Sequence, residues 1–331
     1  MTAVAHDGNE VAAGPRAAAG LGLALLSAFS FGLAGALARP LLESGWSAGA
    51  VVLIRIGLGA LVLLPFGLRA VRGRWHLVRR SLPLITAYGV LAVAGAQFCY
   101  FSAVRYLQVG PALLIEYTAP AAVVLWLWLR RGQRPGLLTV GGATVAAFGL
   151  VLVLDVLTGV GLHPAGVAWA LAAMVGAAAY FLISGDDSTG LPPLALATGG
   201  LVVGALALGA LAIVGLLPMR AATASVEYAG LQVAWWVPMV ALGLVTSAVA
   251  YGTGVAAIRV LGSRLASFVA LSEVVAGVLW SWALLGELPR AVQLLGGLLI
   301  LVGVVGVKLG EREIGAEEIP DRGATDPAAA A

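Results

Sequence analysis

The fold of this chain is decided by a stretch that occurs twice. Residues 103–135 read AVRYLQVGPALLIEYTAPAAVVLWLWLRRGQRP, and residues 257–289 read AIRVLGSRLASFVALSEVVAGVLWSWALLGELP. They align without a gap at a shift of 154 residues, which pairs Arg105 with Arg259, Leu107 with Leu261, Trp126 with Trp280, Trp128 with Trp282, Gly132 with Gly286 and Pro135 with Pro289. A chance match between apolar helices would pair leucines but not this series, so the chain contains an internal repeat.

The repeat lies in a chain that is too apolar to be a soluble protein. Of its 331 residues, 61% are hydrophobic and 11% are charged, whereas soluble domains average about 45–50% apolar and about 25% charged. One helical crossing of a bilayer takes about 20 apolar residues, so this composition predicts roughly ten crossings. We therefore expect an all-α polytopic membrane protein, not a soluble enzyme, a disordered chain or a disulfide scaffold.

Apolar segments long enough to cross as helices agree with that number. They lie at 20–38, 47–68, 82–101, 107–129, 137–154, 166–184, 194–217, 231–253, 262–284 and 291–309. The sequence thus predicts a disordered cytoplasmic tail at 1–19, one five-helix repeat at 20–155, a second at 165–309, and a disordered, acidic and Ala-rich cytoplasmic tail at 310–331.

The basic residues predict the orientation of these spans. With the N-terminus inside, 14 of the 19 basic residues fall in cytoplasmic segments and four in outside loops, while Arg55 lies within the second span. The positive-inside rule therefore favours an N-in, C-in topology. Because each repeat has an odd number of spans, the second copy enters the membrane from the opposite side. Inverted repeats of this kind are typical of secondary transporters, which open a midplane site to either side.

Several segments also resemble a known family. They are AFSFGLAGAL from Ala28, LIRIGLGALVLL from Leu53, LLIEYTAPAAVVL from Leu113, SEVVAGVLWSWALLGELP from Ser272 and GGLLILVGVVG from Gly296. Over about 20–309 the chain is similar to the ten-span, EamA-like members of the drug/metabolite transporter superfamily. The Glu-Tyr-Thr-Ala-Pro run at 116–120 resembles homoserine/threonine-type exporters. The resemblance implies an inner-membrane carrier that exports amino acids or related small metabolites. One departure is Glu273-Val274-Val275, where many members have Glu-Pro-Val, so a proline kink is not expected there.

Three ionisable residues lie well inside predicted spans: Arg55, Glu116 and Glu273. Each costs about 2.5–3.5 kcal/mol at the bilayer centre on insertion scales, so each should face a cavity or a partner. In one interpretation an arginine–carboxylate pair only locks helices together. In the other, one carboxylate pairs with Arg55 and the second binds a substrate amine or a proton, and we favour Glu116 for that role.

Polar residues near the two acids extend the candidate site. Pro120 lacks an N–H and should loosen the helix four residues after Glu116, and carbonyls freed at such breaks commonly line transporter sites. Tyr117 and Thr118 add donors beside Glu116, and Ser272 adds one beside Glu273.

The third and eighth spans carry further polar groups at membrane depth: Gln97, Tyr100, Thr246 and Tyr251. Each of these side chains has two alternative roles, a hydrogen bond between helices or a contact with the ligand, and the sequence does not favour either. Glycines spaced by seven occur at Gly142, Gly149, Gly296 and Gly303. This spacing keeps them on one helix face, which favours close packing of the fifth and tenth spans.

Sequence signals for other functions are missing. The three histidines form no metal-ligand spacing, and no P-loop exists because Lys308 is the single lysine. We therefore expect no enzyme activity and no cofactor. The expected partners are a small-molecule substrate, with proton coupling as one option, and the lipid bilayer, but no nucleic acid. A multidrug or lipophilic-cation exporter is the first alternative, and an integral-membrane enzyme or sensor is the second. The cargo, the coupling ion, the direction of transport and the oligomeric state are not readable from the sequence. Whether Arg55 pairs with Glu116, with Glu273 or with neither is also left open.

Overall fold

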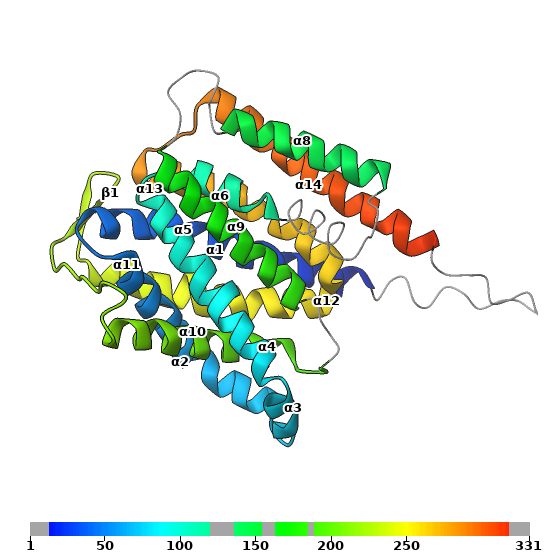
Figure 1. Ribbon diagram of the computed structural model, residues 1–331, viewed down its shortest axis with the longest axis horizontal. Coiled ribbons are helices and arrows are strands. Elements are labelled where there is room, and N and C mark those ends of the chain that lie inside the picture. Colours follow the sequence, from blue (N-terminus) through cyan, green and yellow to red (C-terminus); the bar gives the residue numbers. More distant parts are fainter. Residues whose placement is uncertain (1–12, 120–135, 154–162, 185–188, 318–331) are drawn as a thin grey trace, which may run out of the picture.

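The computed structural model describes residues 13–119, 136–153, 163–184 and 189–317. They form a bundle of helices (Figure 1). The first-repeat helices are α1 (Ala13–Glu43), α2 (Ala48–Ala70), α3 (Trp75–Arg80), α4 (Leu82–Ala87), the π-helical η1 (Tyr88–Gly95), α5 (Ala96–Val104), α6 (Val109–Glu116) and α8 (Leu137–Val153). The later helices are α9 (Pro164–Ser184), α10 (Pro193–Ile213), α11 (Trp236–Gly243), the π-helical η3 (Leu244–Val249), α12 (Ala250–Ala270), α13 (Ser272–Leu285) and α14 (Ala291–Glu317).

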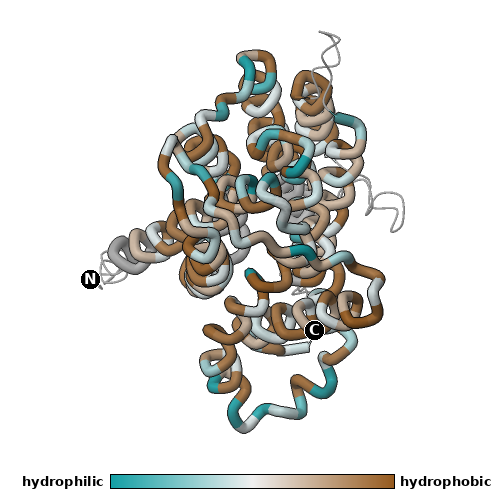
Figure 2. The backbone as a smooth tube through the Cα atoms, turned by 90° about the vertical axis from the view of Figure 1, so that its left-hand side faces the viewer, coloured by the Kyte–Doolittle hydropathy of each residue, from teal (hydrophilic) through white to brown (hydrophobic). Residues whose placement is uncertain are grey.

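Five of the described helical stretches are long and apolar enough to cross a membrane: Ala18–Glu43, Ala48–Ala70, Leu82–Val104, Pro193–Ile213 and Trp236–Gly254. Shorter apolar helices cover Leu137–Val153, Pro164–Tyr180, Ser272–Leu285 and Ala291–Val307. Hydrophobic residues dominate these helices, and hydrophilic ones gather mainly in the connections (Figure 2). Large apolar side chains also face outward, such as Leu61 at 68% exposure and Leu206 at 67%. Such a surface suits lipid rather than water.

Two strands interrupt the expected all-α pattern. The eighth span was expected to begin at residue 231, but β1 (Val226–Tyr228) and β2 (Leu231–Val233) form an antiparallel hairpin, and helix resumes only at Trp236. The two residues between the strands, Ala229 and Gly230, have φ values of 49° and 81°. Positive φ at both positions is what a tight two-residue hairpin turn requires, because it matches the twist of the flanking strands.

The boundary between the eighth and ninth spans also differs from the prediction. Residues 254–261 were expected to form a cytoplasmic loop, but α12 runs unbroken from Ala250 to Ala270. No proline occurs in this segment, so nothing in its backbone forces the helix to end. The break comes instead at Leu271, immediately before Ser272 and Glu273. The predicted ninth span is therefore divided beside its carboxylate.

The internal repeat is visible in the backbone. At the shift of 154 residues, η3 corresponds to residues 90–95, which lie inside η1. Both π-helical segments occur in the middle of their spans, between α4 and α5 and between α11 and α12. Because π-helical turns are rare and cluster at functional sites, their matched positions mark the centre of each repeat.

The α8/α14 pair lies along one side of the bundle (Figure 1). A Cβ atom built on Gly149 would lie 2.6 Å from the carbonyl oxygen of Gly296, and one on Gly303 would lie 2.5 Å from that of Gly142. Real Cβ atoms do not approach so closely, so the backbones pack at a distance that only glycine permits. The predicted role of the four spaced glycines in packing is confirmed.

Candidate functional site

Two helix breaks in equivalent positions form the centre of the candidate site. After α6, the hydroxyl of Thr118 donates to the carbonyl oxygen of Ile115 at 2.7 Å. Before α13, the hydroxyl of Ser272 donates to that of Val269 at 2.6 Å. Thr118 and Ser272 correspond at the 154-residue shift. A side-chain hydroxyl that takes a backbone carbonyl competes with the helical ladder, so each repeat uses one hydroxyl to stabilise its break.

The two predicted carboxylates lie at the ends of these broken helices. Glu116 is the last residue of α6, and Glu273 is the second residue of α13. The Tyr117 hydroxyl donates to Oε2 of Glu273 at 2.6 Å, which joins the two repeats. Both acids are half-buried, and they interact electrostatically with each other. The structure thus brings together two acids that are far apart in the sequence.

Arg55 is the most deeply buried charge near the site, with 1% exposure. Its Nε donates to the hydroxyl of Thr246 and its Nη2 to the carbonyl of Thr246, both at 2.8 Å. Its Nη1 donates to the side-chain oxygen of Gln97. The guanidinium carbon also lies 5.4 Å from the ring centroid of Phe101, a cation–π distance. Arg55 therefore connects α2 to α5 and to η3.

The partners of Arg55 differ from both sequence interpretations, each of which paired Arg55 with a carboxylate. Within the described residues, both ion pairs involve Arg39 instead. Arg55 interacts with Glu116 and Glu273 only through longer-range electrostatics. The physical reason is that the neutral acceptors of Gln97 and Thr246 accept hydrogen bonds from all three nitrogens of its guanidinium. Both carboxylates consequently lack a cationic partner among the described residues.

Aromatic side chains surround this arrangement. Tyr251 packs edge-on against Phe31, with ring centroids 4.9 Å apart. Tyr100 is 5% exposed, and its hydroxyl has no hydrogen-bond partner in the described part of the chain. Sequence reasoning did not single out Phe101, since one phenylalanine in an apolar helix carries no signal. Its place under Arg55, one turn after Gln97, could have been noticed only once the partner of Arg55 was known.

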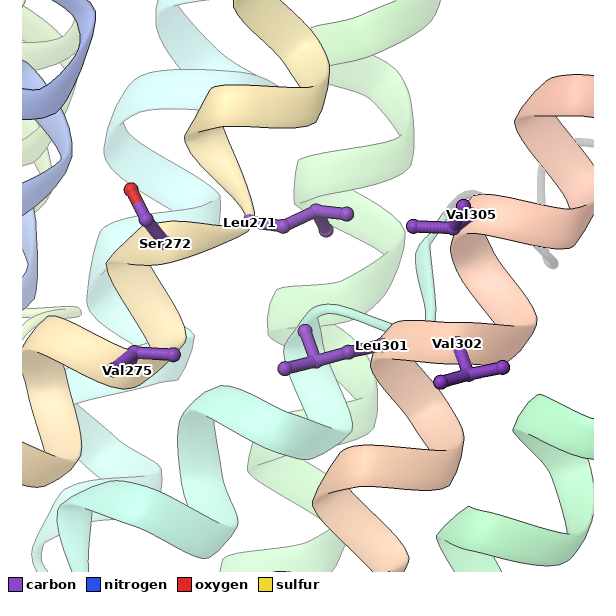
Figure 3. Close-up of a pocket in the computed structure, with 6 residues that line it drawn as sticks. All are labelled: Leu271, Ser272, Val275, Leu301, Val302 and Val305. Atoms are coloured by element: carbon purple, nitrogen blue, oxygen red, sulfur yellow. The ribbon is translucent and has the colours of Figure 1, made fainter.

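An open groove of about 370 Å³ lies between the start of α13 and α14 (Figure 3). Its walls are Leu271, Ser272, Val275, Leu301, Val302 and Val305. The Ser272 oxygen points away from the α14 side chains, which agrees with its bond to Val269 (Figure 3). The groove wall is therefore apolar, and the polar chemistry lies on the other side of the break.

Two further residues of the predicted site are Thr118 and Pro120. Thr118 also donates to the sulfur of Met174 at 3.0 Å. Pro120, predicted to break the fourth span, lies outside the described residues, and the described break already begins at Tyr117. No cluster of three or more potential metal ligands occurs among the residues that the structure describes.

Comparisons with known proteins agree with this architecture. The model of the EamA-like transporter family matches residues 18–155 and 164–309. The uncharacterized inner membrane transporter YicL of Salmonella typhimurium is 23% identical in an alignment of 302 residues, which covers 87% of this chain and 94% of that protein. A solved crystal structure of a protein matches with a TM-score of 0.57 at 23% identity, covering 88% of this chain and 98% of the other, which shows a shared fold. The chain belongs to the EamA-like transporter family and is a multi-pass transporter of the inner membrane.

Proposed function

We propose that this transporter exports small metabolites such as amino acids by alternating access. In this proposal the repeats at 20–155 and 165–309 each supply five spans, and both termini are cytoplasmic. The matched helix breaks and π-helical segments support two inverted halves around a central site. Arg69 in the last turn of α2, and Arg72 and Arg74 in the connection to α3, support the N-in orientation.

One observation carries the proposal: each repeat places a carboxylate at a helix break, and neither carboxylate has an ion-pair partner among the described residues. Glu116 and Glu273 lie at the broken ends of α6 and α13, and Tyr117 donates to Glu273. An unpaired carboxylate at membrane depth is costly unless it binds a cationic group or a proton. We assign these acids to the substrate amine and to proton coupling, with Gln97, Tyr100 and Tyr251 as surrounding contacts.

Arg55 has a positioning role in this proposal. Its hydrogen bonds hold Thr246 of η3 and Gln97 of α5, which follows η1 directly. Arg55 thus joins the central parts of the third and eighth spans, while its charge lowers the electrostatic cost of the two nearby acids.

A lipophilic cation is the second candidate cargo. Tyr251, which packs against Phe31, interacts electrostatically with both acids, and acids together with aromatic rings would attract a cation with an apolar body. Amino acids differ from such cations in carrying a carboxylate, which needs a donor such as the unpartnered Tyr100 hydroxyl. Binding of an amino acid should therefore depend on the Tyr100 hydroxyl, whereas binding of a lipophilic cation should not.

A ligand screen tests the proposal. Purified protein is heated with amino acids or lipophilic cations at pH 5.5 and pH 7.5, and the unfolding temperature is measured. We expect an amino acid to stabilise the wild-type protein, Glu116→Gln and Glu273→Gln to lose this effect, and Tyr100→Phe to weaken it. Stabilisation by cations alone would favour the second cargo. Stabilisation that survives both carboxylate substitutions would contradict the proposed site.

A further inference from the structure

The end of the bundle that carries Arg39 is closed by tight packing above the two acids. Val109 and Ala112 of α6 are fully buried, and Leu113 is 3% exposed. A Cβ atom on Gly277 of α13 would clash with the Leu113 side chain, and one on Gly32 of α1 would lie 2.8 Å from the carbonyl oxygen of Glu273. Among the described residues, α1, α6 and α13 are therefore in direct contact at this level, so these helices must separate if the site is to open between them.

Arg39 joins all three of these helices. From α1, its Nη1 donates to the carbonyl oxygen of Leu107, just before α6, at 2.8 Å. The same nitrogen lies 2.8 Å from Oε1 of Glu287, just after α13. Arg39 also pairs with Glu43 at 3.0 Å, but Glu43 is on α1 itself. The contact with Glu43 therefore cannot hold α1 to another helix, whereas the contacts with Leu107 and Glu287 do.

Glu287 is held in a way that permits release. Its side chain is 14% exposed, and its Oε2 accepts no hydrogen bond among the described residues. Burial, together with the nearby Glu43 carboxylate, raises the pKa of Glu287 above its ordinary value, and Arg39 and the backbone N–H of Val109 oppose this shift. In a partly buried ion pair of this kind, the cost of desolvating the charges offsets much of their attraction. The ion pair therefore favours one arrangement of the helices, but it is weak enough to separate when they move.

The β1–β2 hairpin connects the same two helices at this end. The Tyr228 hydroxyl donates to the carbonyl oxygen of Leu37 on α1 at 2.6 Å. The Ala229 N–H donates to the carbonyl oxygen of Leu284 on α13 at 2.8 Å. Movement of α13 away from α1 would break one of these bonds together with the ion pair, so the hairpin and the ion pair would release together.

We propose that Arg39 and Glu287 form a latch that keeps this end of the transport pathway closed, and that the pathway opens when the pair separates. The inference rests on the proposed alternating-access function, in which this is the outward-facing end. The latch holds α13, which carries Glu273, to α1 and to the start of α6, which carries Glu116. Its release would expose the half-helices that bear both acids.

Hydrogen–deuterium exchange of the full-length protein in lipid nanodiscs tests the latch without a substrate. The variants are Glu287→Gln, Arg39→Gln, the double variant, and Glu43→Gln as the matched control. We expect either single latch substitution to raise amide exchange in residues 109–116 and 272–285 about two- to tenfold. The double variant should add little, because both substitutions remove the same interaction. Glu43→Gln should exchange like the wild-type protein.

Three outcomes would overturn the latch. They are unchanged exchange in Glu287→Gln, an equal rise in Glu43→Gln, and a rise that extends to residues 137–153 and 291–307, which would indicate general loosening. The result is independent of the ligand screen. If exchange rises selectively at α6 and α13 in the latch variants but no ligand stabilises the protein, the latch is supported and the assigned cargo is refuted. If a ligand stabilises the protein but exchange is unchanged in the latch variants, the cargo is supported and the latch is refuted.

Discussion

Two pairs of helices, each with one helix from either repeat, pack against each other in different ways. The α8/α14 pair consists of continuous helices whose backbones meet through Gly142, Gly149, Gly296 and Gly303. The α6/α13 pair consists of two short helices of 8 and 14 residues that end or begin at a break beside a carboxylate. Residues 137–153 and 291–307 contain no ionisable residue, whereas α6 and α13 carry Glu116 and Glu273.

The difference teaches how one repeat supplies both a scaffold and a site. Two helices whose backbones pack closely over several turns have few alternative arrangements, because close-packed interiors deform little. A broken helix has free backbone groups and can move as a half-helix. We therefore assign rigidity to α8/α14 and movement to α6/α13, and the following predictions test this assignment.

The largest effect is expected from neutralising the acids of the broken pair. Glu116→Gln and Glu273→Gln should each reduce export by about tenfold to a hundredfold or more, because hydrogen bonds to a charged group contribute about 1.5–3 kcal/mol. Export of the stabilising ligand from cells, normalised to membrane-inserted protein, is the measurement. Glu227→Gln, at the exposed middle position of β1, is the control. Wild-type export by both site variants would remove the acids from the mechanism.

A smaller effect is expected from Tyr117→Phe, which keeps the ring and removes the donor to Glu273. The apparent affinity for the stabilising ligand should change by about tenfold, since the carboxylate loses a charge-assisted hydrogen bond. The exposed Tyr106, which stacks on His163, provides the control Tyr106→Phe. Equal affinity in both variants would show that the bond between the repeats does not shape the site.

The glycine-packed pair should respond in stability rather than in transport. Gly149→Leu places a side chain against the Gly296 carbonyl, so we expect a loss of about 1–3 kcal/mol in the free energy of unfolding. Gly141→Leu, on the same helix, meets nothing within 4 Å and should cost far less. Thermal unfolding in detergent measures both. If the Gly149 variant instead stays stable and loses transport, the assigned roles of the two pairs are exchanged.

The smallest effect concerns the hydroxyls at the breaks. Thr118→Val and Ser272→Ala should each lower the free energy of unfolding by about 0.5–1.5 kcal/mol, because each removes a side-chain hydrogen bond at a half-buried or buried helix break. Thr144 makes the same kind of bond to the carbonyl oxygen of Val140, but on the exposed face of the unbroken α8. Thr144→Val should therefore cost close to nothing. A similar loss in all three would mean that the breaks are ordinary helix.

The sequence predicted the parts of this molecule that depend on pattern. The register of the repeat, the glycine packing and the three charges inside spans are all readable from spacing and composition. The α12–α13 boundary was not, because a continuous helix and two spans with a short loop have the same apolar pattern around Arg259. The break before Glu273 forms without a proline. The Ser272 hydroxyl stabilises it by donating a hydrogen bond to the carbonyl oxygen of Val269.

Partner choice was beyond sequence reasoning. Both interpretations of the sequence gave Arg55 a carboxylate partner, although pairing with neither acid was left open. In the structure Gln97 and both oxygens of Thr246 accept its hydrogen bonds, and their alignment with Arg55 depends on how η3 and α5 pack. The Arg39–Glu287 contact was missed for a similar reason, since its partners meet only after α1 and α13 have packed.

The central claim is that the broken pair moves while the glycine-packed pair stays fixed. Hydrogen–deuterium exchange of the wild-type protein in lipid nanodiscs tests this claim most directly, because it compares both pairs in one molecule. We predict faster exchange in residues 109–116 and 272–285 than in 137–153 and 291–307, with the stabilising ligand slowing only the first two. Equal protection of all four segments, or faster exchange in the glycine-packed pair, would contradict the account.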